Sequence, residues 1–259
     1  MSQENDNKVD VFEGLNPEVK VRTKKMMMWL VIFAIVMVFA GITSAMIVLY
    51  GSLIWLKITP PSILWVSNAL VIASSITMYL TLKSVRSGKK SGALTFLITT
   101  FLLGLGFVYT QNAGWKKLQD MGMGATQSIN EQGLTVTKWN TLDRLSGTYD
   151  QDYFVEYQGE RVVKVGEEYY KTSDTGHLNP VTRELNGTFN AGGAMLSILI
   201  YLHIAHLFFG LIYTVVNIIR IQRGRIHQEN WISLYAGGMY WHFMGILWLY
   251  LFAFTFFIF

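Results

Sequence analysis

The sequence has no cysteine among its 259 residues. Disulfides, thiolate metal sites and iron–sulfur clusters are therefore excluded, although this absence says nothing about redox compartment. Charged residues are also scarce: they make up 15% of the chain, against roughly 25% in soluble domains. In their place the chain is 51% hydrophobic and 14% aromatic. This composition excludes an ordinary soluble domain and indicates a membrane protein.

Five stretches are apolar enough and long enough to cross a bilayer, which takes about 20 residues of helix. None contains Asp, Glu, Lys or Arg before its last residues. That fits a true span, because a charge near the bilayer centre costs at least ~2.5–3.5 kcal/mol. The stretches cover residues 26–50, 62–82, 92–111, 190–219 and 233–259. We therefore expect an all-α membrane protein, a bundle of five transmembrane helices.

Basic residues give the bundle its orientation. They lie before the first span, between the second and third, and between the fourth and fifth: Lys20, Arg22, Lys24, Lys25, Lys83, Arg86, Lys89, Lys90, Arg220, Arg223 and Arg225. Five spans place all three groups on one side, and the loop between the first two spans holds only Lys57. The positive-inside rule then predicts a cytoplasmic N-terminus and a periplasmic C-terminus. The pI of about 9.1 thus reflects topology, and we expect no nucleic-acid partner.

The segment before the first span differs from a cleaved signal peptide. Its first twenty residues carry five acids and two lysines, without a basic start followed by a short apolar core. The predicted organisation is a cytoplasmic tail, helices 1 to 3, a periplasmic insertion and helices 4 to 5, over residues 1–25, 26–111, 112–189 and 190–259.

The insertion, residues 112–189, has eight Lys or Arg and eleven Asp or Glu. Long domains translocate regardless of charge, so it leaves the topology unchanged. Residues 153–157, 161–165 and 168–172 are β-prone and separated by glycine turns, which predicts hairpins. The flanks, 112–135 and 172–188, are rich in Gly, Asn, Ser and Thr and are predicted to be loop. We expect a small β-rich element between helices 3 and 4.

Three histidines in the last two spans are candidate ligands. His203 and His206 share one helix face, and His242 lies in the final span. Histidine ligates metals and haem iron, so a haem b protein with ligands on two helices is one interpretation. Hydrogen bonding of neutral imidazoles to Tyr, Ser or backbone carbonyls is the other. A copper site would need carboxylates or more histidines. The lack of carboxylates at membrane depth also argues against a proton path or a transporter.

Short motifs occur in all five spans. The last two spans carry Leu202-His203-x-x-His206-x-x-x-Gly210-Leu211 and Tyr240-Trp241-His242-Phe243-x-x-x-x-Trp248-Leu249-x-Leu251-Phe252. The first three carry Met28-Trp29-Leu30 with Phe39-Ala40-Gly41-x-x-Ser44-Ala45, Pro60-Pro61-x-x-Leu64-Trp65-x-x-Asn68 with Ser74-Ser75, and Leu102-Leu103-Gly104-x-x-Phe107 with Gln111 and Trp115. In this order they resemble subunit III of haem–copper cytochrome c oxidases, in the five-helix bacterial form.

The resemblance implies a non-catalytic core subunit of an aa3-type terminal oxidase in aerobic respiration, in the bacterial inner membrane. The complex reduces oxygen to water and translocates protons, and this subunit would support subunit I stability, lipid binding and proton uptake. Its implied partners are subunits I and II, which hold haem a and copper, and phospholipids between the helices. No catalytic, cofactor or metal residue is then expected in this chain, and the motif residues are structural: His203, His206, Gly210, Trp241, His242 and Trp248. A quinol oxidase subunit III and a di-histidine haem b electron carrier remain alternatives.

Three features depart from that family. Ala34-Ile35 stands where the family usually has Ser-Glu, and Gly245 stands where an acid usually follows the Trp-His-Phe run. The role of the missing glutamate in proton uptake is therefore left open for this chain. The insertion of residues 112–189 replaces a short loop. We expect it to contact subunit II, a cytochrome c domain or another respiratory complex.

Overall fold

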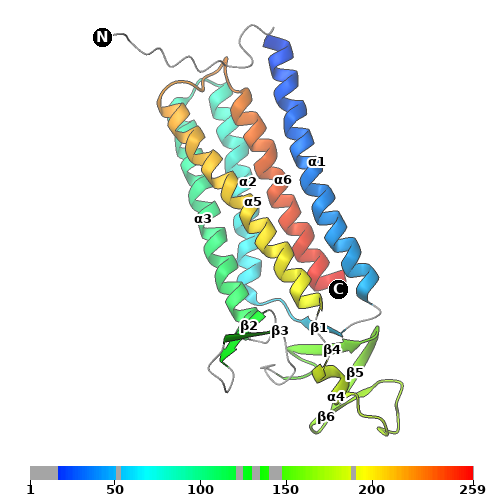
Figure 1. Cartoon of the computed structure of the whole chain (residues 1–259). Helices are drawn as coiled ribbons and strands as arrows, with labels where there is room; N and C mark the ends of the chain where they lie inside the picture. The colour runs from blue at the N-terminus through cyan, green and yellow to red at the C-terminus, as the bar shows by residue number, and fades with distance from the viewer. Residues whose placement is uncertain are drawn as a thin grey trace.

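The computed structural model describes residues 17–50, 54–120, 125–129, 135–139, 148–187 and 191–258 (Figure 1). Within them, five helices are long and apolar enough to cross a membrane. They are α1 (Pro17–Tyr50), α2 (Ser62–Arg86), α3 (Lys90–Asp120), α5 (Ala191–Gln222) and α6 (Ile232–Ala253), the last continued by a π-helical turn over Phe254–Ile258. The predicted five apolar helices are confirmed. Helix α1 already begins at Pro17, so residues 17–25 of the predicted tail are helical.

The three basic segments lie together at one end of the bundle, here called the basic end. It comprises the start of α1, the α2–α3 turn and the α5–α6 loop (Figure 1). Glycines reverse the chain in both connections, because Gly88 and Gly224 adopt φ angles of +71° that disfavour a side chain. The other end of the bundle carries the strands and is here called the sheet end.

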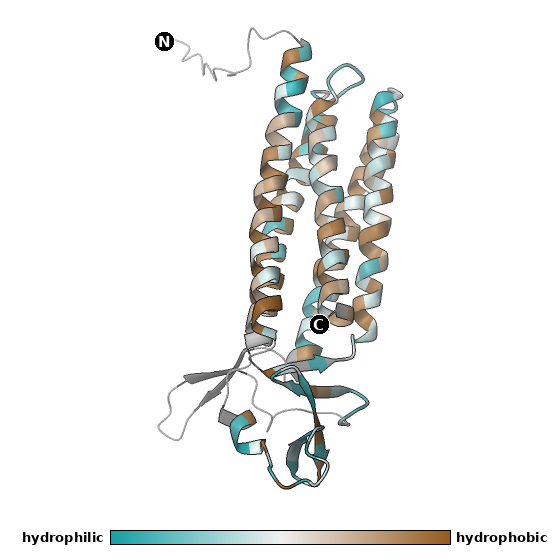
Figure 2. Cartoon of the chain, turned by 90° about the vertical axis from the view of Figure 1, so that its right-hand side faces the viewer, coloured by the Kyte–Doolittle hydropathy of each residue, from teal (hydrophilic) through white to brown (hydrophobic). Residues whose placement is uncertain are grey.

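The helices pack as a core of four with α1 on its outer side. Helices α2 and α3 form the most intimate pair; α2 packs mainly against α6, and α3 mainly against α5. Helix α1 packs mainly on α5 and α6, where Ile35, Phe39 and Met46 meet Leu199 and Met244. Figure 2 shows hydrophobic residues along the helices and hydrophilic ones at the two ends and around the sheet. Apolar side chains that face outward, such as Phe209, suit contact with lipid or another subunit.

A four-stranded antiparallel sheet has the order β1-β4-β5-β6, with strands β1 (Ile54–Ile58), β4 (Tyr153–Tyr157), β5 (Glu160–Val165) and β6 (Glu168–Lys171). The hairpins predicted in this region are confirmed. Val155, Val162 and Tyr169 are buried on one face, and this alternation keeps each strand in register. Strands β2 (Ala125–Ile129) and β3 (Thr135–Trp139) form a separate hairpin.

The prediction that both flanks of the hairpins are loop is wrong in places. Helix α3 runs on to Asp120, since residues 116–119 (Lys-Lys-Leu-Gln) are good helix formers and Leu118 is buried. Strand β2 follows in the same flank, and α4 (Thr182–Gly187) occupies part of the other. Strand β1 was also missed: it lies between the first two spans and pairs with β4, about one hundred residues later in the chain. Residues 121–124, 130–134, 140–147 and 188–190 of these segments lie outside the described residues.

Candidate functional site

Two tryptophans of α6 are hydrogen-bonded to polar side chains of α2. The indole Nε1 of Trp241 donates to the Oγ of Ser74 at 3.1 Å. The indole of Trp248, two helical turns later, donates to the Oδ1 of Asn68 at 2.9 Å. Both pairs are buried, where an unmade hydrogen bond would cost free energy. They fix the register of α6 against α2.

His203 lies inside the four-helix core. Its side chain is 1% exposed. The imidazole centroid lies 6.2 Å from the ring of Phe107 and 5.4 Å from that of Trp248. Its Nδ1 has no hydrogen-bond partner among the described residues. Aromatic rings thus surround the imidazole, as expected, and no hydrogen bond of Nδ1 to the described residues accompanies them.

His206 faces a different neighbourhood. Its Nδ1 lies 2.7 Å from the carbonyl oxygen of Leu202, one turn earlier, as expected for a neutral imidazole in an apolar helix. It lines a groove of about 480 Å³ between α1 and the α5–α6 pair. Ala34 and Ile35 line the same groove. They stand where the resembled family usually has Ser-Glu, so this part of the groove is apolar. The hydroxyl of Tyr240 donates to the backbone carbonyl of His206 at 2.8 Å.

The three histidines do not form a common ligand set. His203 points into the core, His206 lines the groove, and His242 is half-buried on α6. No group of three or more His, Cys, Asp or Glu side chains within the described residues could hold a metal ion. The cavity beside His203 measures about 20 Å³, so a macrocycle has no room against this ring. The residues around His203 therefore do not fit a haem.

Glycines let the helices approach Trp241 and Tyr240 closely. A Cβ at Gly104 would lie 2.9 Å from both Leu211 and Trp241. A Cβ at Gly210 would lie 3.3 Å from Tyr240 and 3.6 Å from Trp241. The Gly210 of the motif thus contacts the aromatic residues of the closing motif, and Gly104 makes the tighter contact.

Hydroxyl pairs between α2 and α3 were not singled out from the sequence. Ser67 Oγ donates to Thr110 Oγ1 at 2.9 Å, and the hydroxyls of Thr77 and Thr100 lie 2.8 Å apart. Small polar residues at positions 67, 74 and 81 of α2 recur every seven residues and all are buried. This seven-residue period is the sequence signal from which a buried polar face of α2 could have been predicted.

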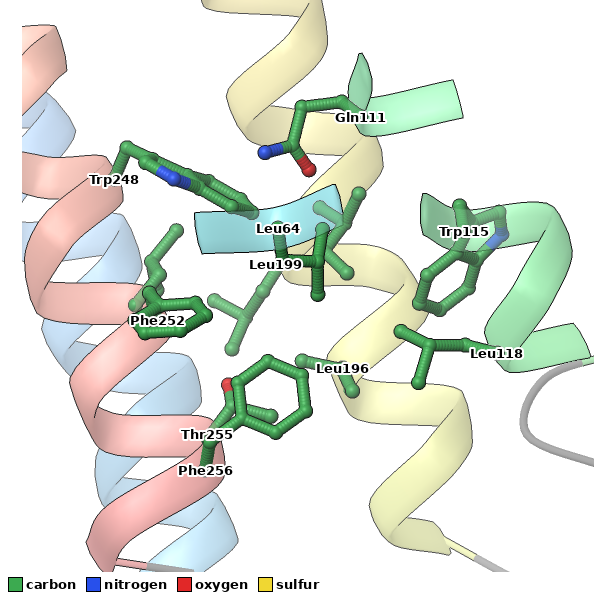
Figure 3. Close-up of a pocket in the computed structure, with 12 residues that line it drawn as sticks. Leu64, Gln111, Trp115, Leu118, Leu196, Leu199, Trp248, Phe252, Thr255 and Phe256 are labelled. Atoms are coloured by element: carbon green, nitrogen blue, oxygen red, sulfur yellow. The ribbon is translucent and has the colours of Figure 1, made fainter. Parts of the chain in front are cut away.

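A second small cavity lies nearer the sheet end, between the same four helices. Figure 3 shows Gln111 and Trp248 on one side of it and Leu196, Phe252 and Phe256 on the other. It measures about 20 Å³ and its walls are mostly apolar. The Nε2 of the buried Gln111 has no hydrogen-bond partner among the described residues.

Cations at the basic end lie against aromatic rings and helix ends. The Arg86 guanidinium lies 3.9 Å from the ring centroid of Trp231. Lys25 Nζ lies 5.1 Å from the ring centroid of Tyr235, and Lys90 Nζ donates to the carbonyl of Gln222 at 2.9 Å. These contacts tie α1 to α6, α2 to the α5–α6 loop and α3 to the end of α5.

The sheet is attached to the bundle through Glu156 of β4. Its carboxylate accepts a hydrogen bond from Tyr50, at the end of α1, and lies 3.5 Å from Lys57 Nζ of β1. Farther out, hydrogen bonds from the Ser173 side chain and backbone lower the pKa of Glu160. Backbone N–H groups, first that of Asn179, lower the pKa of Asp174. The insertion is thus anchored at its inner edge and carries stabilised carboxylates at its outer loops.

These features define a multi-pass helical membrane protein with a small antiparallel sheet at one end. No family model matches the chain. Over 55 residues it is 38% identical to a cytochrome c oxidase subunit 3 from Alkalihalophilus pseudofirmus. The matching segment is 21% of this chain and spans 27% of that relative.

Proposed function

We propose that the chain is a non-catalytic core subunit, subunit III, of an aa3-type haem–copper terminal oxidase in a bacterial inner membrane. The similarity to a cytochrome c oxidase subunit 3 carries the proposal, and the five apolar helices support it. The complex would take electrons from cytochrome c, reduce oxygen to water and translocate protons. In this assignment the basic end is cytoplasmic and the sheet end periplasmic, as the positive-inside rule favours.

The chain would act through packing. Its outward apolar faces would contact subunit I and phospholipids, and haem a and copper would reside in subunits I and II. The motif residues would hold α5 and α6 in register with α2. The enclosure of His203 by Phe107 and Trp248 supports this structural role for the motif.

Affinity purification of the full chain in mild detergent tests the assignment. Mass spectrometry should identify two larger oxidase subunits, and a reduced-minus-oxidised spectrum should show an a-type haem. The haem should remain with the larger subunits when this chain is separated from them. A b-type spectrum that stays with the separated chain would instead establish a haem b carrier. Turnover with reduced cytochrome c or with quinol identifies the electron donor.

The insertion would contact subunit II, a cytochrome c domain or another respiratory complex. Val163, Val165 and Leu178 present apolar side chains that are 38%, 44% and 80% exposed. Exposed apolar side chains of this kind suit a protein contact. Deleting the insertion would also remove β4, the strand with which β1 pairs. Substitutions on the insertion are therefore a cleaner test.

The test variant is Val163→Ser with Val165→Ser and Leu178→Ser, and the control is Glu167→Gln in the exposed β5–β6 turn. The triple variant should lose one of these three partners while subunit I still co-purifies, and the control should keep every partner. Retention of every partner by the triple variant would exclude this surface as the contact.

A further inference from the structure

A small cavity lies where α2, α3, α5 and α6 meet. Its walls include Ser74, Gly104, His203, Trp241 and Gly245, and its volume is about 20 Å³. One water molecule needs roughly 10–15 Å³ of such space. The cavity therefore admits a single water and excludes larger ligands.

The close helix contacts at Gly104 and Gly245 keep this cavity from closing. A Cβ at Gly245 would lie 3.0 Å from Val71 Cγ1, and one at Gly104 would lie 2.9 Å from Trp241. The backbones of α3 and α6 thus form two of the walls and are already in close contact with their neighbours. Neither helix can move inward to close the cavity, because the neighbouring side chains block it.

Ser74 and His203 are the lining residues whose side chains have hydrogen-bonding capacity left. Ser74 Oγ donates to the carbonyl of Val71 at 2.8 Å and accepts from the indole of Trp241 at 3.1 Å. A hydroxyl has two acceptor lone pairs, so one remains on Ser74. His203 is 1% exposed, and its Nδ1 has no partner among the described residues. A buried imidazole N–H left unpaired is costly.

We propose that one water molecule binds in this cavity, accepts a hydrogen bond from His203 Nδ1–H and donates one to Ser74 Oγ. Two polar partners meet the minimum for a buried water. The water joins His203 of α5 to the Ser74–Trp241 pair of α2 and α6. The imidazole is then neutral with its proton on Nδ1. Cavity size and hydrogen-bonding groups carry this site, and the oxidase assignment is not needed for it.

A structure of the full chain in its purified assembly, at a resolution that reveals ordered waters, tests the site directly. Density is expected within hydrogen-bond distance of both His203 Nδ1 and Ser74 Oγ. A map that shows ordered waters elsewhere in the bundle and none in this cavity would overturn the proposal.

A double-mutant cycle provides a second readout in the same assembly. His203→Leu and Ser74→Ala each remove one partner of the water. Once the first substitution has broken the water bridge, the second should lower the melting temperature less. The melting-temperature loss caused by His203→Leu should shrink by roughly 2–4 °C in the Ser74→Ala background. The control pairs His203→Leu with Ser75→Ala, the neighbouring hydroxyl, which does not line the cavity. Those two losses should add, and additive losses in the Ser74 cycle as well would count against a bridging water.

Discussion

Two adjacent glycines of α6 have different surroundings. A Cβ at Gly237 would lie 2.1 Å from Tyr213 Cε1, whereas one at Gly238 would find its nearest neighbour at 3.8 Å. Gly237→Ala must displace the Tyr213 ring and break its 2.7 Å hydrogen bond to the Ser233 carbonyl. We expect it to destabilise the protein by about 1–3 kcal/mol, as overpacking does. Thermal unfolding in detergent measures the loss.

Gly238→Ala is the matched control for that prediction. Its new methyl would make an ordinary contact with Met78, and alanine favours a helix over glycine by up to about 1 kcal/mol. It should be neutral or slightly stabilising. Equal effects of the two substitutions would mean that Tyr213 yields without cost.

The indole–amide pair between α6 and α2 gives a second residue-scale prediction. Trp248→Phe keeps an aromatic ring and removes the donor to Asn68 Oδ1, which then stays buried without it. We expect a loss of about 1–2 kcal/mol in unfolding free energy. Adding Asn68→Leu should recover part of it, since no polar atom is then left unpaired. The control is Trp65→Phe, at a site 52% exposed, which should change stability less. An equal loss for Trp65→Phe would show that the buried hydrogen bond to Asn68 is not the cause of the Trp248→Phe effect.

At this scale the sequence motifs contained both members of several contacts, such as Trp248 and Asn68, but did not show which residues pair. Trp241, Trp248 and His203 could be selected because large or polar residues in apolar helices are conspicuous. Which residues they contact depends on how α2 is rotated and shifted along its axis relative to α5 and α6. A sequence pattern does not specify this relative position. The same holds for His203 and His206, which are three residues apart yet face a closed core and an open groove.

Among the elements, the long helices were predictable because hydropathy alone determines them. The β4–β5–β6 hairpins were predictable because alternation and glycine turns are local signals. Strand β1 was not, because Ile54–Ile58 is a short apolar run and becomes a strand only through its pairing with β4. The extension of α3 to Asp120 was missed for the opposite reason: a polar segment was assigned to loop although it continues a helix.

The β5–β6 region should lose stability in acid. Hydrogen bonds lower both pKa values from the ordinary 4.5 and 3.8: for Glu160 those of the Ser173 side chain first and then of its backbone N–H, and for Asp174 those of backbone N–H groups, first that of Asn179. Carboxylates with depressed pKa values stabilise the fold above their unfolded pKa, and this contribution is lost as pH falls through the folded one. We therefore expect the loop after β6 to open progressively as pH falls below the ordinary pKa values of these two carboxyls.

Limited cleavage by pepsin, which works in acid, would detect this opening. The amides involved are Ser173 N, 2.5 Å from Glu160, and Asn179 N, 2.8 Å from Asp174. The double variant Glu160→Gln with Asp174→Asn cannot form the charge-assisted bonds at any pH. Cleavage of the wild-type loop relative to this variant should rise as pH falls. A constant ratio would show that the two carboxylates do not stabilise the loop.

Considered as a whole, the molecule separates two kinds of chemistry at its two ends. The basic end gathers Lys and Arg side chains, with Arg86 against Trp231, whereas the sheet at the other end carries carboxylates and cation–aromatic pairs of its own, such as Arg161 with Phe154. The sheet joins β1, between α1 and α2, to β4, which follows α3. It therefore ties α1, which packs mainly on α5 and α6, to the rest of the bundle.

This arrangement makes a definite prediction about membrane orientation, and the absence of cysteine makes it easy to test. Single cysteines at Ser87 in the α2–α3 turn and Glu229 in the α5–α6 loop mark the basic end, and one at Ser173 marks the sheet end. A membrane-impermeant maleimide should label Ser173→Cys in intact spheroplasts, and the other two only after permeabilisation. The reversed pattern would place the basic end outside, against the positive-inside rule. Labelling of Ser87→Cys and Ser173→Cys from the same side would contradict a third helix that spans the membrane, and with it the five-span bundle.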